Sequence, residues 1–172
     1  MQGIITYGLR YTSSSGVLLA GYANSHWAGN AVDILERSGM QDCKSMSVPM
    51  TTNLKKLRDL ATSSQDVDST LYRQLIGSLM YLMHMRPNIC YTVNALSQFM
   101  SDPKCIHWVA AKHVLKYVRG TITYGLRYTS SSGVLLAGYA DSDWAGSVVD
   151  WKSTSGYCFS MGSAVISWST RK

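Results

Sequence analysis

The chain has 172 residues, of which 46% are hydrophobic and 15% are charged, a composition that suits one globular domain or two small modules. No run of about 18 apolar residues occurs, so we expect no membrane span, and the first residues lack the basic stretch and apolar core of a signal peptide. The net charge is +6, and a positive balance attracts phosphate backbones.

The first element in chain order is a long internal repeat. Residues 3–33 reappear at 120–150, and only five of the 31 positions differ. A solenoid would repeat its unit back to back, whereas these copies flank the unrelated residues 34–119. We therefore infer a recent duplication of the coding sequence, which also predicts that the N-terminal copy repeats a β-hairpin of the second one. The differing pairs are Ile4/Thr121, Asn24/Asp141, His26/Asp143, Asn30/Ser147 and Ala31/Val148.

Next, a short helix is expected to end over residues 34–39, with Gly39 as its C-terminal stop. Residues 40–70 are rich in Ser, Thr and Asp and include Pro49. We interpret them as an extended linker that crosses a surface.

Helical periodicity then predicts three amphipathic helices, over 69–84, from Pro87 up to Ser101, and over 104–118, with Gly120 as the stop of the last. Their expected inward faces comprise Leu71, Tyr72, Leu75, Ile76, Leu79, Met80 and Met83, then Ile89, Val93, Leu96, Phe99 and Met100, then Trp108, Ala111, Leu115 and Val118.

After Gly120 the period of the apolar residues changes to two, which predicts strands. Four strands are expected, over 121–128, 134–140, 157–161 and 164–169. The short spacing between them is typical of an antiparallel meander.

One pair of carboxylates stands at the end of the second predicted strand. Asp141 and Asp143 are two residues apart, so an extended backbone points both side chains to the same face. Paired carboxylates can hold Mg²⁺, although surface aspartates after a strand are also common. The first copy has Asn24 and His26 at these positions, which we interpret as drift in an unneeded copy, the alternative being a change of metal preference.

The third predicted helix carries a basic face. Lys112, Lys116 and Arg119 follow i, i+4, i+7 spacing, and no acidic residue occurs between Asp102 and Asp141. Such a face predicts weak, sequence-independent binding of RNA or DNA; the alternative is a solvated basic surface without a partner. We expect the face to lie opposite the apolar one and to carry no aromatic residue placed to stack on bases.

Several ordered motifs run along the chain: Tyr72–Leu82, Arg86–Ile89, Leu96–Met100, Lys116–Thr121, Gly138–Gly146, Lys152–Tyr157 and Ile166–Ser169. In this order they resemble the Pol polyproteins of copia-type (Ty/copia) LTR retrotransposons, between the polymerase core and ribonuclease H. Residues 34–50 resemble the segment that closes the polymerase region. The resemblance implies that Asp141 is the first metal-binding aspartate of ribonuclease H, and that Mg²⁺ serves the parent enzymes.

The resemblance implies an α+β chain, in which a helical connection segment precedes an incomplete ribonuclease H-like antiparallel β-meander, with a duplicated β-hairpin at the N-terminus. The expected divisions are a duplicated partial hairpin (1–33), a reverse transcriptase tail and linker (34–70), a three-helix connection region (71–119) and a truncated ribonuclease H-like domain (120–172).

The sequence also departs from the family pattern. Its only glutamate is Glu36, and the family's catalytic glutamate and polymerase aspartates have no counterpart. We therefore expect a catalytically incomplete fragment that needs no cofactor by itself and leaves Asp141 vestigial. The alternatives are a ribonuclease H on RNA–DNA hybrids, if another chain completes it, and a domesticated interaction module. An unfinished sheet edge would also permit self-association.

The four cysteines, Cys43, Cys90, Cys105 and Cys158, occur singly without paired spacing. Scattered thiols are typical of reduced cysteines in an intracellular protein, the alternatives being disulfides or a zinc site. We therefore expect a cytoplasmic or nuclear protein that is not secreted.

Overall fold

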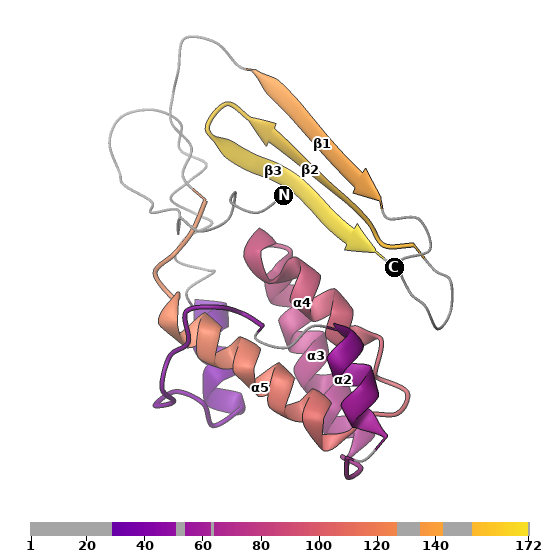
Figure 1. Cartoon of the computed structure of the whole chain (residues 1–172). Helices are drawn as coiled ribbons and strands as arrows, with labels where there is room; N and C mark the ends of the chain where they lie inside the picture. The colour runs from indigo at the N-terminus through magenta and orange to yellow at the C-terminus, as the bar shows by residue number, and fades with distance from the viewer. Residues whose placement is uncertain (1–28, 51–53, 63, 127–134, 143–152, 172) are drawn as a thin grey trace. The chain divides into compact units, whose positions relative to one another are not determined.

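The computed structural model describes residues 29–50, 54–62, 64–126, 135–142 and 153–171 (Figure 1). These residues form two compact units, a helical unit that ends at Ile122 and a sheet unit that begins at Thr123. Because helices and an antiparallel sheet occupy separate stretches of the chain, the α+β class is confirmed.

The helical unit begins with a helix over residues 29–37. Gly39 follows with a φ of +62°, a left-handed conformation that favours glycine, and the N–H of Met40 donates to the carbonyl of Leu35 at 2.8 Å. The predicted helix end with a glycine stop is therefore confirmed.

Helix α2 (Leu54–Ala61) corrects the extended linker expected over 40–70. Apolar residues at 54, 57 and 61 follow helical spacing, and Leu57 is fully buried. This apolar pattern is short and lies among polar residues, so it did not predict a helix. Residues 41–48 form turns, bends and irregular chain that contact another helix described below.

Helices α3 (Ser69–Met83), α4 (Pro87–Ser97) and α5 (Cys105–Gly120) confirm the three predicted helices. The Asp68 side chain caps α3 by accepting from the N–H of Thr70 at 2.7 Å. Gly120 is the last residue of α5 and not its stop; the helix ends there because Thr121 leaves the helical conformation.

The helices enclose one apolar core, in which α5 packs against α2, α3 and α4 (Figure 1). Most of the predicted inward residues are buried. One expectation is wrong, because Leu71 is 51% exposed. The other inward residues that are only half-buried pack against the core, namely Met80, Met83, Phe99, Met100 and Trp108. Because α5 has neighbours on several sides, it also buries His107 and Val114, which a single-face pattern does not predict.

The sheet unit contains β1 (Leu136–Ser142), β2 (Ser155–Met161) and β3 (Ala164–Arg171) in the antiparallel order β1-β2-β3. The meander is therefore confirmed. Gly162, with a φ of +61°, makes the turn between β2 and β3. Residues alternate along β2 between exposed and half-buried, which is the pattern of a sheet with two unlike faces.

The strand expected over 121–128 is wrong for residues 121–126, which form a turn and irregular chain. Thr121 is buried because Arg86 binds it, and Ile122 packs against the helical core. These contacts hold the start of the segment on the helical unit. Residues 127–128 lie outside the described residues, as do residues 1–28 of the N-terminal hairpin expected over 1–33; its remaining residues, 29–33, belong to the helix over 29–37.

Among the described residues, no helix is both long and apolar enough to cross a membrane.

Candidate functional site

A lysine, Lys104, stands at the N-terminal end of α5, ahead of the basic residues of the helix. Lys104 Nζ lies 2.6 Å from the Asp66 carboxylate and 3.0 Å from that of Asp102. The hydrogen bonds to these carboxylates raise the pKa of Lys104. Because Lys104 already has two acidic partners, its charge adds little to the basic face, which starts at Lys112.

Lys112 lies against an aromatic ring. Its Nζ is 5.2 Å from the centre of the Trp108 ring, within the range of a cation–π interaction. Trp108 also packs against the core, so the apolar face and the basic face meet at Trp108, and the expectation that they lie opposite each other is wrong at this end of the helix. Sequence reasoning missed this pair, although i, i+4 spacing on a helix is the signal that would have found it.

Residues 41–48 cover part of the basic helix. The N–H of Met46 donates to the carbonyl of Lys116 at 3.2 Å, and His113 Nε2 lies 3.0 Å from the carbonyl of Val48. Arg119 Nε donates to the carbonyl of Gln41 at 2.5 Å. The segment therefore runs beside the C-terminal half of α5.

The three predicted binding residues differ in exposure. Lys112 and Lys116 are half-buried, whereas Arg119 is exposed. The bond from Arg119 to the loop uses Nε alone, so its two terminal nitrogens remain a pair of donors for a phosphate. The loop also adds Asp42 and Lys44, both exposed and of opposite charge, so the surface keeps its positive balance.

The strand-end aspartate lies in a different unit. Asp141 is the sixth residue of β1, is exposed, and pairs with Gly156 of β2. It shares a sheet face with Tyr139 and Cys158. Burial raises the pKa of the Cys158 thiol, so this thiol favours its neutral form.

The described part of the sheet does not fit a two-ion magnesium site. Asp141 is its only acidic side chain, and a two-ion site needs several carboxylates. No group of three or more His, Cys, Asp or Glu side chains that could hold a metal occurs among the described residues. Asp143 lies outside them.

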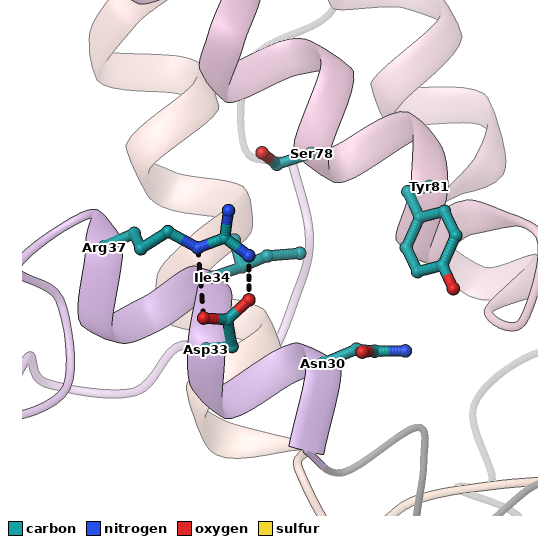
Figure 2. A pocket seen from close by; sticks show the side chains of 6 residues that line it. All are labelled: Asn30, Asp33, Ile34, Arg37, Ser78 and Tyr81. Carbon is teal, nitrogen blue, oxygen red and sulfur yellow. Dashed lines mark hydrogen bonds and ion pairs between the residues drawn. The ribbon is translucent and has the colours of Figure 1, made fainter.

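A small pocket of about 150 Å³ lies between the helix over 29–37 and α3 (Figure 2). Arg37 and Asp33 form a bidentate ion pair at its rim, with a 3.0 Å bond from Nε to Oδ1. Since these charges satisfy each other and ligand pockets usually exceed about 300 Å³, the pocket offers no obvious ligand site. Its lining residues are Asn30, Asp33, Ile34, Arg37, Ser78 and Tyr81.

Sequence comparison finds relatives among transposon proteins. The chain is 40% identical over 141 residues to "Retrovirus-related Pol polyprotein from transposon RE2" of Arabidopsis thaliana, a match that covers 82% of this chain and 10% of that protein. It is 34% identical over 143 residues to "Retrovirus-related Pol polyprotein from transposon TNT 1-94" of Nicotiana tabacum, covering 80% and 11%. The chain thus spans about a tenth of these polyproteins.

A shorter relative is "Secreted RxLR effector protein 161" of Plasmopara viticola. It is 46% identical over 102 residues, which cover 59% of this chain and 72% of that protein. No family model matches the chain, and no solved structure matches it.

Proposed function

The chain belongs to the Pol polyproteins of copia-type retrotransposons, and on that premise we propose that it joins the end of their reverse transcriptase region to the start of ribonuclease H. In this proposal the helical unit is the connection region, and β1, β2 and β3 are the first strands of the ribonuclease H-like sheet. The segment contacts the nucleic acid that both enzymes handle, through phosphates and without reading sequence.

The observation that supports this contact is the composition of α5. The helix carries Lys112, Lys116 and Arg119 and has no acidic residue along its whole length, Cys105–Gly120. A row of positive charges on a rigid helix attracts phosphates because binding releases counterions. The Trp108 ring beside Lys112 is already engaged by that cation, so base stacking there should contribute little.

The test measures binding of the chain to a fluorescent duplex and to a single strand of the same length at several salt concentrations. With about three phosphates neutralised, log K should fall with log salt at a slope of about −3, and Kd should be about 10⁻⁴–10⁻⁶ M near physiological salt. Changing Lys112, Lys116 and Arg119 together to Ala should abolish binding without unfolding α5, since Ala favours helix.

A matched control removes the same charge elsewhere. Arg37, Lys56 and Arg73 are exposed on three other helices, and their change to Ala also lowers the net charge by three. If this control weakens binding as much as the α5 variant does, net charge and not the α5 face is responsible. Binding that is unchanged in the α5 variant would also reject the proposal.

We also propose that the 172 residues do not cleave RNA by themselves, because the acidic residues that complete a two-ion site have no counterpart in this segment. The assay is an RNA–DNA hybrid with Mg²⁺ or Mn²⁺, comparing the chain with Asp141→Ala. Cleavage by the parent chain that disappears in the variant would reject this statement and favour the ribonuclease H alternative.

Self-association is a second candidate, and the sheet carries the observation that favours it. One face presents Leu136, Phe159 and Met161, which are 65%, 42% and 44% exposed, and an exposed apolar patch invites association. Sedimentation velocity over a range of concentrations should show reversible dimers. A monomer at all concentrations would reject this candidate, and salt-independent dimers would separate it from nucleic-acid binding.

A further inference from the structure

The middle strand of the sheet, β2, presents its aromatic side chains on its more exposed side (Figure 1). Tyr157 and Phe159 are 43% and 42% exposed, whereas the alternate positions Gly156, Cys158 and Ser160 are half-buried. An antiparallel sheet with one solvated face ordinarily places its apolar residues on the covered side. The side that carries the two rings is therefore a candidate binding surface, here called the aromatic side.

Small residues flank both rings on the neighbouring strands. Residues that pair directly across an antiparallel sheet lie on the same side of it, so the register identifies the neighbours of each ring. The ring centres are 5.6 Å apart, and the ring planes are inclined by 50°. No large side chain stands directly beside either ring on β1 or β3, which leaves room for a flat ligand. The flanking residues are Ala140 and Ser169 at Tyr157, and Gly138 and Ser167 at Phe159.

The Phe159 ring is held in place by its contact with β1. A Cβ at Gly138 would lie 2.6 Å from Cε1 and 2.8 Å from Cδ1 of Phe159, so the ring leans over the position that a larger side chain would occupy. A ring that is already held in place loses less conformational freedom when a ligand binds.

The charges of the sheet favour an anionic ligand on the aromatic side. Arg171 of β3 is exposed and pairs with Ser155, which shares the aromatic side with Tyr157. Asp141 is the only acidic residue in the described part of the sheet. It pairs with Gly156 and therefore lies on the opposite side. Two rings, one cation and no described carboxylate suit a ligand that carries both flat rings and negative charge.

We propose that Tyr157 and Phe159 form a stacking platform for the bases of single-stranded RNA or DNA, and that Arg171 contacts a phosphate of the same strand. Every base has a π face, so the platform accepts any sequence. Exposed aromatic residues on a sheet stack two or three bases in RNA-recognition motifs. A duplex keeps its bases paired and stacked on one another, so it cannot use these rings. The choice of nucleic acid as the ligand rests on the proposed function, but the site is separate from α5.

An apolar protein surface fits the aromatic side less well than a nucleic acid does. It would cover Ser167, Ser169 and Arg171 without offering them hydrogen-bond partners, and burial of unpaired polar groups costs free energy. Phosphate, sugar and base edges provide such partners.

The experiment measures binding of the full chain to a fluorescent single strand and to a duplex of the same length. One stacked base contributes about 5- to 150-fold in affinity. Tyr157→Leu should therefore weaken single-strand binding at least fivefold and leave duplex binding unchanged, because leucine is apolar but has no π face. Tyr157→Phe should bind both probes as the parent chain does. Phe159→Leu also removes the contact with Gly138, so Tyr157→Leu is the cleaner variant.

A crosslink in the parent chain locates the contact without any substitution. A single strand that carries 5-iodouracil reacts under long-wavelength ultraviolet light with aromatic side chains that stack on the base. Mass spectrometry should find the crosslinks at Tyr157 or Phe159. This measurement remains valid even if Tyr157→Leu unfolds the sheet, and crosslinks only at other residues would overturn the proposal.

Tyr139→Leu is the matched control, because Tyr139 is 58% exposed and pairs with Cys158 on the opposite side of the sheet. The proposal is overturned if this control weakens single-strand binding as much as Tyr157→Leu does, or if Tyr157→Leu has no effect. Dimers of the chain that persist when the single strand is saturating would also overturn it, since a second copy would then occupy the aromatic side.

Failure of this proposal is distinguishable from failure of the proposed function. The α5 variant tests the phosphate contact and should weaken binding of duplex and single strand alike, whereas Tyr157→Leu should affect the single strand alone. Normal binding by the α5 variant rejects the proposed function, and normal single-strand binding by Tyr157→Leu rejects only the stacking platform.

Discussion

At the scale of single residues, Arg86 is the most unusual interior side chain, because it is charged and only 3% exposed. Its Nη1 donates to the Thr121 hydroxyl at 2.6 Å, and its Nη2 donates to the Thr121 carbonyl at 2.5 Å. Thr121 is the residue after α5, where the helix macrodipole places partial negative charge. Arg86 therefore joins the start of α4 to the end of α5.

Replacing Arg86 by Met should lower the free energy of unfolding by about 2–4 kcal/mol, because the buried Thr121 carbonyl and hydroxyl lose their donor. Thr121→Val removes only the hydroxyl and should cost about 1 kcal/mol. Urea titration followed by circular dichroism measures both. Equal losses in the two variants would show that the carbonyl bond contributes nothing.

His107 links stability to pH. Its ring is fully buried, stacks on Phe99 at 3.8 Å and accepts at Nδ1 from the N–H of Lys104. Burial lowers its pKa below the ordinary 6.5, although a hydrogen bond with the Leu57 backbone and the charge of Asp102 act in the opposite direction. Because the folded chain favours neutral His107, its contribution to stability is present above pH 6.5 and is lost as pH falls below that value.

The urea concentration at the unfolding midpoint should therefore decrease as the pH is lowered from 7.5 to 5. His107→Asn should reduce this pH dependence, while the Asn side-chain oxygen still accepts from the N–H of Lys104. An NMR titration of the His107 ring should give a midpoint below the ordinary value. A midpoint above 6.5, or an unchanged pH dependence in the variant, would contradict the expectation.

At the scale of secondary-structure elements, two helical glycines have opposite surroundings. A Cβ at Gly77 in α3 meets nothing within 4 Å, whereas a Cβ at Gly120 in α5 would lie 2.9 Å from the Cβ of Ser45. Gly120 thus lets residues 41–48 approach α5 closely.

Gly77→Ala should raise the free energy of unfolding by about 0.5–1 kcal/mol, because alanine has the higher helix propensity. Gly120→Ala should lower it by about 1–2 kcal/mol, since the loop must move. Thermal unfolding of both variants measures the difference. A stabilised Gly120→Ala chain would indicate that residues 41–48 do not rest on α5.

At the scale of the whole molecule, the two units differ in how much apolar surface they bury. Among the described residues, twenty of the buried apolar side chains lie in the helical unit and two, Leu126 and Ala164, lie in the sheet unit. Burial of apolar surface is the main favourable contribution to folding. The helical unit should therefore be the more stable of the two.

Amide hydrogen exchange should show this difference directly. The amides of Val114 and Leu115 should exchange at the rate of global unfolding, whereas those of Tyr139 and Phe159 should exchange faster through local opening of the sheet. Proteolysis at low enzyme concentration should leave a resistant fragment that contains α3, α4 and α5. Slower exchange in β1 than in α5 would contradict the expectation.

The sequence alone determined the elements whose periodicity is long or whose turns need special residues. The three helices from Ser69 to Gly120 were predictable because each buries a stripe at helical spacing, and β2 and β3 because their side chains alternate about the turn at Gly162. The motif order also indicated the copia-type family that the relatives support. The same pattern failed for α2, whose eight residues give too short a signal.

Only the tertiary structure decided which surfaces stay exposed and where the first strand begins. Periodicity ranks the faces of one helix, but it does not report that residues 41–48 lie across α5 or that Lys112 rests on Trp108. The alternation of apolar residues also predicted a strand that includes Thr121. That prediction failed because buried Arg86 binds Thr121 at the end of α5, a contact that alternation does not report. These outcomes depend on contacts between residues far apart in the chain, which local spacing does not encode.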